Sequence, residues 1–560
     1  MANRVAVLGG GVGGLSAAHE LIERGFEVTV YERREVFGGK ARSIPVPNTG
    51  QSGRKDLPGE HGFRFFPGFY KHLPDTMKRI PYPGKASVAE NLVETTRIHL
   101  ARAGQPPIIF TARIPQNAED WMVTFKEIFG GIGVPEEEVT FFGERLFVLL
   151  TSCPERMDAE YEQIPWWTFI DADNHSPAYQ TLLGKGLTRS LVAVRAQEGS
   201  TRTAGRTLLQ LLFGLMTLGG FDRLLDGPTS DVWLTPWVNY LRERGVEFQG
   251  GTTIQALHAT AAGIISVSME TGGQSRQITA DYYISALPVE IMTPLVDAPI
   301  KTLAPSLANL GNLHTAWMNG IQFYLAQDVP LEFGHSLYAD SPWALTSISQ
   351  RQFWSEANLA NVGGGNVGGI LSVDISDWEM PGILYGKTAK QCTAQEIKDE
   401  VWAQVKQHVN VAGAEVLRDD NLLSWFLDPD VLIPNPVGVT SNLEPLMINT
   451  SGSLQYRPEA STEIPNLFLA SDYVKTYTDV ACMEAANEAA RRAVNALLDR
   501  AGSPAQRATL WPLGELEVFK PLIEIDRVRF LAGQPHVGSQ SSRWNVISRL
   551  RGFLQKFFGT

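Results

Sequence analysis

The chain has 560 residues, of which 44% are hydrophobic and 19% are charged, enough to bury a large core. Its net charge of −12 argues against a nucleic-acid partner, and its three scattered cysteines and ten histidines predict neither disulfides nor a metal site. The first predicted strand begins at Val5, so we expect no signal peptide and a cytoplasmic location.

The first elements alternate as strand, helix and strand. An apolar run at Val5–Leu8 predicts a buried parallel strand, Leu15–Arg24 predicts a helix, and Phe26–Tyr31 predicts the next strand. Glu32 follows that second strand directly. This order of strand, turn, helix, strand and acid is the setting in which glycine motifs bind dinucleotides.

The turn before the helix fits G-x-G-x-x-G at Gly9, Gly11 and Gly14, with Gly13 between them. Gly9 permits a tight turn, Gly11 lets the backbone approach a pyrophosphate, and Gly14 lets helix and strand pack closely. The free N–H groups of the helix N-terminus attract phosphate. Glu32 is placed to bond ribose hydroxyls, and its charge disfavours the 2′-phosphate of NADP.

A second G-x-G-x-x-G match, at Gly363, Gly365 and Gly368, lacks this setting. The residues before it do not form an apolar strand, and Ile370–Ile375 after it alternates as a strand does. The pattern therefore predicts a loop between strands.

Three further blocks follow the dinucleotide motif along the chain. The first continues from Glu32 as "RREVFGGKARS" and leads to "GEHGFRFF" near residue 60. The second predicts a helix over Leu234–Arg244, then a strand that holds Thr253 and Ile254, then a return strand, "ADYYISALP". The third is "IPNLFLASDYVKTYTDVACMEAANEAARRAVNAL", an apolar strand, an acid, a loop and a helix.

Together these blocks resemble FAD enzymes of the amine oxidase and carotene desaturase superfamily, in particular plant and cyanobacterial phytoene and ζ-carotene desaturases. The resemblance implies FAD as the cofactor. With the N-terminal glycines and Glu32, it implies that the cofactor is bound by Arg33, Gly38, Gly39, Lys40, Arg42, Gly62, Phe63, Arg64, Thr253, Ile254, Asp472 and Met483. Two residues depart from the family pattern, since Ser471 and Ala485 stand where it has glycine.

The fold class that follows is α/β, with a discontinuous, Rossmann-type (GR2-like) FAD-binding domain and an inserted α+β substrate domain. We assign segments 1–90, 225–300 and 455–505 to the FAD-binding domain, and 91–224 and 301–454 to the substrate domain. Residues 506–560 form a C-terminal extension. A capping box at Thr393 and Glu396 predicts a helix in the inserted region.

The candidate catalytic residues are His61, Arg64, Tyr473 and Lys475. His61 can exchange a proton at neutral pH, and Arg64 can stabilise an anionic reduced flavin or pair with Glu60. The alternative is that Glu60, His61 and Arg64 only hold their loop together. By resemblance to the amine oxidases, Tyr473 and Lys475 belong to a cage over the flavin, and a packed loop is the alternative.

The resemblance implies an oxidoreductase that acts on an apolar isoprenoid or polyene lipid by hydride transfer to flavin N5, such as a carotene-type desaturase or a squalene-pathway dehydroxylase. A quinone or oxygen would accept the electrons. A flavin amine oxidase is a second interpretation, and a non-redox isomerase, or a protein that uses FAD only as a structural support, is a third.

Two apolar segments suggest a lipid surface. The run Leu208–Phe221 is too short to span a bilayer, and predicts either a buried helix or a wall of a lipid-accepting tunnel. The tail predicts an amphipathic helix whose apolar face holds Trp544, Ile547, Leu550, Leu554, Phe557 and Phe558. This helix is expected either to lie in an anionic membrane surface, on the inner face, or to dock on the protein itself.

Overall fold

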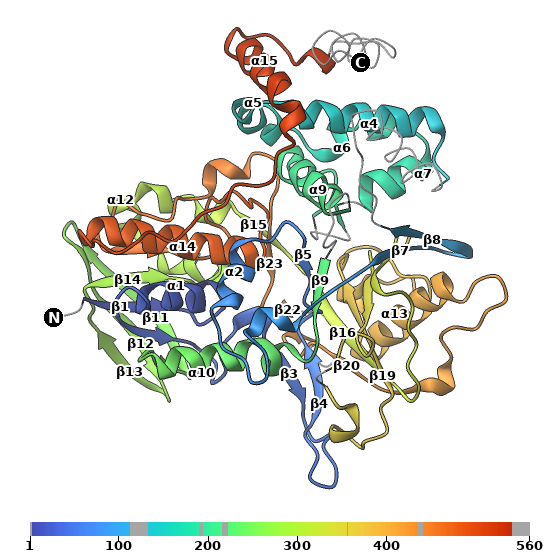
Figure 1. The fold of residues 1–560 in the computed structure, drawn as a ribbon, viewed down its shortest axis with the longest axis horizontal. Helices are drawn as coiled ribbons and strands as arrows, with labels where there is room; N and C mark the ends of the chain where they lie inside the picture. The colour runs from blue at the N-terminus through green and yellow to red at the C-terminus, as the bar shows by residue number, and fades with distance from the viewer. Residues whose placement is uncertain are drawn as a thin grey trace.

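The computed structural model describes residues 3–111, 133–186, 188–189, 194–215, 222–355, 357–433 and 441–539. Its two largest sheets occupy opposite halves of the molecule, and a cluster of helices adjoins them (Figure 1). In the described part of the chain, every helix falls short of the length and apolarity that crossing a bilayer requires.

The first sheet is parallel throughout and confirms the α/β fold class. Its strands, in spatial order, are β10 (Glu247–Gln249), β2 (Glu27–Tyr31), β1 (Arg4–Leu8), β14 (Tyr282–Ser285) and β24 (Leu467–Leu469). The strands come from the three segments that the sequence assigns to one domain, while the domain boundaries themselves stay predictions. The strands expected at Val5–Leu8 and Phe26–Tyr31 are confirmed to within one residue.

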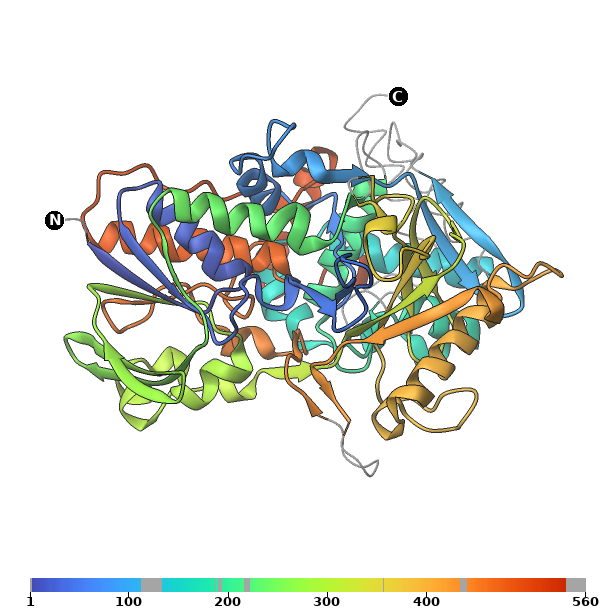
Figure 2. The ribbon, with the colours of Figure 1, turned by 90° about the horizontal axis from the view of Figure 1, so that it is seen from below.

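Helices cover one face of this sheet and an antiparallel meander covers the other (Figure 2). The helices are α1 (Val12–Ile22), α10 (Thr235–Glu243) and α14 (Met483–Arg500). The meander consists of β11 (Thr252–Thr260), β12 (Gly263–Thr271) and β13 (Gln274–Ile278). The helix expected at Leu234–Arg244 is confirmed as α10.

Helix α1 begins three residues earlier than expected, because it includes two of the motif glycines. A Cβ on Gly13 would lie 2.0 Å from the carbonyl oxygen of Ala470, which follows β24. A Cβ on Gly14 would lie 1.9 Å from the carbonyl oxygen of Gly9. Both contacts are backbone contacts that no other residue type permits, so the glycines bring the helix close to the sheet.

The second large sheet has seven strands and mixed directions. In spatial order they are β20 (Leu422–Leu427), β16 (Asn319–Leu325), β19 (Gly369–Ile375), β18 (Thr346–Ser349), β17 (Gly334–Tyr338), β7 (Arg97–Arg102) and β8 (Gln105–Thr111). Helix α13 (Ala394–Val409) packs on one face of this sheet. The capping box at Thr393 and Glu396 is confirmed, and Gly363–Gly368 is the loop before β19.

The helical cluster contains α4 (Glu136–Leu150), α5 (Pro154–Ala159), α6 (Trp166–Phe169), α9 (Thr201–Leu215) and α15 (Lys520–Leu531). The described first part of the apolar run Leu208–Phe221 is the end of α9, where Leu208, Leu209 and Leu212 are buried in the core of this cluster. That part confirms the buried-helix interpretation. The remainder of the run lies outside the described residues.

The C-terminal extension contributes α15, which is anchored on α5. Asp526 accepts hydrogen bonds from Arg156 Nε at 3.0 Å and from the backbone N–H of Cys153 at 2.9 Å. The amphipathic tail from Trp544 onward lies outside the described residues, so its two interpretations stay predictions.

The packing of α1 yields the first testable expectation. A Gly13→Ala substitution places a methyl group against the Ala470 carbonyl, and overpacking of this kind costs about 1–3 kcal/mol. We expect a lower melting temperature for the variant in a thermal unfolding experiment. Gly311→Ala is the control, because Gly311 is exposed and its Cβ would meet only a Thr293 methyl at 3.6 Å. Equal melting temperatures for both variants would contradict this account of the helix.

Candidate functional site

A cavity of about 350 Å³ is lined by residues of both large sheets. It brings together most of the predicted cofactor-binding residues: Gly9, Gly11, Gly13, Glu32, Arg33, Gly38, Gly39, Lys40, Gly62, Phe63, Arg64, Thr253, Ile254, Asp472 and Met483. Gly14 and Arg42 lie outside the lining. The second sheet contributes His335, Thr346 and Asp374.

Two glycine turns meet at one end of this cavity. Gly9 has a φ of +104° and Gly38 a φ of +119°, conformations that other residues rarely adopt. A Cβ on Gly39 would lie 2.9 Å from the Cα of Gly11, so the two turns touch backbone to backbone. Gly11 is also the N-cap of α1 and provides no capping side chain, which leaves the first N–H groups of the helix free for a ligand. The turns therefore fit a diphosphate.

Glu32 lies at the end of β2, beside this turn, and is 8% exposed. Its carboxylate accepts hydrogen bonds from the backbone N–H of Gly10 at 2.8 Å and of Arg34 at 3.1 Å. A carboxylate has about four acceptor positions, so two remain for ligand hydroxyls. Thr252 donates its N–H to the carbonyl oxygen of Glu32 at 2.8 Å, which holds the start of β11 against the site.

The arginines of the second glycine block converge on two buried carboxylates. Arg42 Nη2 lies 2.6 Å from Asp430, Arg34 Nη2 lies 2.7 Å from both Asp430 and Glu444, and Arg33 Nη2 lies 2.8 Å from Glu444. Burial alone would raise the pKa of Glu444, but Arg42, His61 and Arg34 outweigh it and lower that pKa to about 2. Arg42 therefore belongs to a buried ion-pair network and does not line the cavity.

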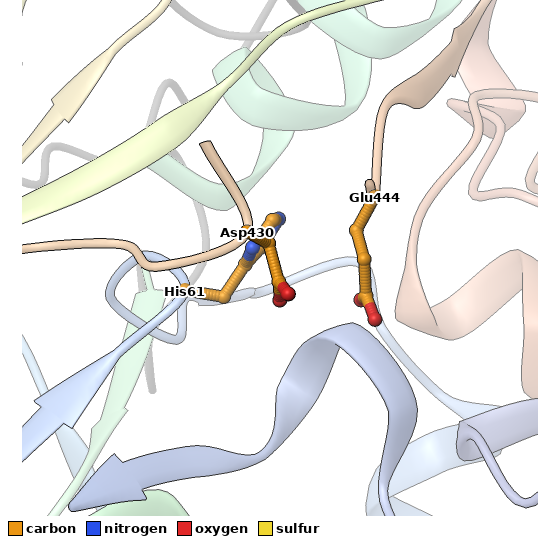
Figure 3. Close-up of side chains that lie close together, drawn as sticks. All are labelled: His61, Asp430 and Glu444. Atoms are coloured by element: carbon orange, nitrogen blue, oxygen red, sulfur yellow. The ribbon is translucent and has the colours of Figure 1, made fainter. Parts of the chain in front are cut away.

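His61 lies beside this network (Figure 3). One ligand atom each from His61, Asp430 and Glu444 lies within 4.8 Å of the others, a spacing that would suit a metal ion. The guanidinium groups of Arg34 and Arg42 already neutralise the two carboxylates, so a cation would have to displace them. We therefore assign no metal to this cluster.

The His61 ring faces a further carboxylate. Its Nδ1 lies 2.6 Å from Asp428 Oδ2, close enough for an ion pair although the contact lacks the geometry of a hydrogen bond. Burial would raise the pKa of Asp428, but its contacts with His61 and Asn319 lower it overall. His61 lines the cavity and is held by a negative partner.

Arg64 lines the cavity from the same loop. Its Nη2 donates to the carbonyl oxygen of Gly62 at 2.6 Å, and its Nε lies 3.9 Å from Glu60. Glu60 is buried and accepts hydrogen bonds from the N–H and the hydroxyl of Thr229, each at 2.8 Å. The expected pairing of Arg64 with Glu60 is therefore present, and Arg64 still faces the cavity.

Tyr473 and Lys475 do not line the cavity. Tyr473 is fully buried, and Lys475 Nζ lies 3.8 Å from the exposed Glu459. Their segment is held by Arg457, which donates to the carbonyl oxygens of Tyr473 at 3.1 Å and Val474 at 2.7 Å. The structure therefore favours the packed-loop interpretation of both residues over the cage.

The N-terminus of α14 forms another part of the wall. Glu484 accepts hydrogen bonds from the N–H groups of Lys71 and His72 at 2.7 Å and of Leu73 at 2.9 Å, which caps α2 (His72–Lys78). These bonds hold the preceding Met483 at the cavity. Of the two departures from the family pattern, Ser471 lies in the lining, while Ala485 is buried inside the helix and outside the lining.

Asp374, a buried acid of β19, also lines the cavity and is not among the residues predicted from the sequence. Burial, with smaller contributions from Glu60 and Asp428, raises its pKa to about 7 against the opposing charge of Arg64. The sequence carried a signal, because this is an acid inside the alternating strand Ile370–Ile375. His335 of β17 also lines the cavity, and burial lowers its pKa to about 3, so it is neutral at pH 7.

Two family models match this chain. Residues 7–80 match the family model described as an NAD(P)-binding Rossmann-like domain, and residues 179–498 match the one described as flavin containing amine oxidoreductase. The second match covers more than half of the chain.

Two similar proteins come from cyanobacteria. A ζ-carotene desaturase of Synechocystis sp. is 23% identical, over 88% of this chain and 97% of its own length. A 15-cis-phytoene desaturase of Synechococcus elongatus is 23% identical, over 91% of this chain and 99% of its own. The solved cyclohexylamine oxidase of Brevibacterium oxydans shares the fold, with a TM-score of 0.57 at 12% identity over 90% of this chain and all of that one.

The glycine turns can be tested for ligand binding by a Gly11→Val substitution. Because Gly11 lines the cavity where the two turns touch, valine side-chain atoms would occupy the space that fits the diphosphate. We expect the purified variant to fold and to lose most of its bound flavin, measured by absorbance after denaturation. Gly311→Val, at an exposed position, serves as the control. Full flavin content in Gly11→Val would refute this placement of the cofactor.

The ion-pair network predicts a specific dependence of stability on pH. Because folding lowers the pKa of Glu444 from 4.5 to about 2, its contribution is complete above pH 4.5 and is lost as the pH falls from there toward 2. Glu444→Gln should cost about 3–5 kcal/mol at pH 7, since it leaves buried guanidinium groups unpaired. Urea unfolding at several pH values should show that the difference in the free energy of unfolding between wild type and variant becomes smaller below pH 4.5. A difference that stays constant down to pH 3 would contradict this prediction.

Proposed function

The chain belongs to the family of flavin containing amine oxidoreductases, and we propose that it uses FAD to dehydrogenate an apolar isoprenoid or polyene lipid. The observation that carries this proposal is the alignment with two carotene desaturases over about nine-tenths of this chain and nearly all of theirs. Such an alignment includes the substrate-side sheet as well as the dinucleotide motif.

The residues present fit FAD. The paired glycine turns offer backbone N–H groups and close approach to a diphosphate, and Glu32 retains acceptor positions for a ribose. Thr253 and Ile254 continue the wall beyond Glu32, where the family places the adenine. Asp472 and Met483 also line the cavity, and the resemblance assigns them to the flavin end.

Much of the cavity lining is apolar. It includes Phe63, Phe65, Ile291, Met318 and Leu446. Such a surface suits a hydrocarbon chain, which has no polar group to anchor. A substrate of this kind is nearly insoluble in water, so we infer that it reaches the enzyme from a membrane surface.

FAD, when bound, would supply a hydride acceptor at N5, and a quinone or oxygen would take up the electrons. The protein orients the substrate and excludes water. Arg64 brings a positive charge to the cavity, where it can stabilise negative charge that develops on reduction. Lys40, whose Nζ lies 3.1 Å from Glu290, brings a second positive charge to the lining beside the glycine turns.

The proposal is tested by mixing the flavin-loaded protein anaerobically with candidate substrates. Phytoene and ζ-carotene in detergent micelles should bleach the flavin absorbance and yield a product lighter by two hydrogens, detected by mass spectrometry. Putrescine and benzylamine should leave the flavin oxidised. Bleaching by amines alone would establish an amine oxidase instead. A polyene product of unchanged mass would establish an isomerase.

A further inference from the structure

The carboxyl group of Asp374 enters the cavity where two neighbouring segments have glycine. Its register partner on β16 is Gly320, and its partner on β18 is Thr346. A Cβ on Gly62 would lie 2.8 Å from Asp374 Oδ1, and a Cβ on Gly320 would lie 2.8 Å from the Cα of Gly62. A side chain at Gly62 would therefore collide with the carboxyl group, and one at Gly320 would push the Gly62 loop away.

This carboxyl group has an unused acceptor. Asp374 is 7% exposed, and its Oδ1 has no hydrogen-bond partner among the described residues. A buried acceptor without a partner is costly unless a proton or a ligand satisfies it. The charged groups that face it are Arg64, Glu60 and Asp428, so one cation opposes two anions. This surrounding allows the carboxyl group to hold or release a proton near neutral pH.

We propose that Asp374 accepts the proton that leaves the substrate during dehydrogenation, an inference that rests on the proposed function. Formation of a C=C bond breaks two C–H bonds on adjacent carbons. One hydrogen leaves with both electrons as hydride and is taken up by the flavin. The other leaves as a proton and forms an O–H bond with Asp374 Oδ1, while its electron pair becomes the new π bond. The neutral acid then releases the proton to solvent before the next turnover.

The other titratable groups of the cavity are less suited to this role. His61 already has Asp428 as a partner at 2.6 Å, and burial lowers the pKa of His335 to about 3, which makes it a weak base. Glu290 is paired with Lys40 at 3.1 Å. Asp374 is the cavity acid that combines an unpartnered oxygen with a position on the substrate-side sheet.

The rate of flavin reduction should depend on pH in one direction. Only the ionised carboxylate can accept a proton, so the rate of flavin reduction should rise about tenfold per pH unit below the pKa of Asp374 and level off above it. With that pKa near 7, the rise should be seen between about pH 5 and 7.

Rapid anaerobic mixing of the flavin-loaded protein with ζ-carotene, at several pH values, tests the inference. Asp374→Asn keeps the shape of the side chain and removes its basicity, and we expect reduction about 100-fold slower without the rise below pH 7. Flavin content and melting temperature should match the wild type. Asp374→Ser provides a second variant if the amide fails to fold, and the exposed Asp420→Asn controls for a change of charge. A wild-type rate and pH profile in Asp374→Asn would overturn the proposal.

Infrared difference spectroscopy gives a readout that needs no substrate. The wild-type spectrum minus that of Asp374→Asn should show a protonated carboxyl band that grows as the pH falls through about 7. If no polyene bleaches the wild-type flavin, the proposed function is wrong. The infrared titration then still tests whether Asp374 holds a proton near neutral pH. A carboxyl group that titrates near pH 7 would support its proton-holding role, and one that stays ionised down to pH 4 would overturn it.

Discussion

The close contact of α1 with the parallel sheet is the constraint on which the site depends. Gly13 and Gly14 allow backbone atoms of the helix to touch Ala470 and Gly9, where any side chain would collide. This contact fixes the N-terminus of α1 at the carboxyl edge of β1. The free N–H groups of the helix then point to the place where the second glycine turn, at Gly38 and Gly39, closes the cavity.

The second sheet is fixed relative to the first by two features of opposite character. One is the ion-pair network, in which Arg34 and Arg42 bind Asp430 and Glu444 from the other half of the molecule. The other is the contact of Gly320 with the Gly62 loop, where the Gly320 N–H donates to the His61 carbonyl at 2.6 Å. The ion pairs and the close backbone contact together fix the position of the second sheet, which contributes part of the cavity wall.

Local patterns in the sequence predicted the dinucleotide half of the site well, because its geometry depends on residues that are close together in the sequence. The strand, the glycine turn, the helix and Glu32 all lie within the first 32 residues, and each has a local physical signature. The capping box at Thr393 is equally local. Long-range features were harder to predict. The partners of Arg42 lie 388 and 402 positions away, and nothing near Arg42 indicates them.

Packing between distant segments also determines the positions of the side chains that were not predicted correctly. Asp374 reaches the cavity only because the register of β16 and β19 places it beside Gly320 and the distant Gly62. Tyr473 and Lys475 were expected at the flavin on the strength of resemblance, but Arg457 binds the backbone of their loop and neither side chain lines the cavity. Resemblance predicted the order of the blocks, while the individual side-chain contacts depend on packing between elements.

A crystal structure of the flavin-loaded protein with a bound polyene would test the central claim most directly. The account predicts density for the dinucleotide between Glu32 and the paired glycine turns, and a substrate carbon within contact distance of Asp374. A polyene bound elsewhere, with the Asp374 carboxyl group facing only protein or the cofactor diphosphate, would contradict it.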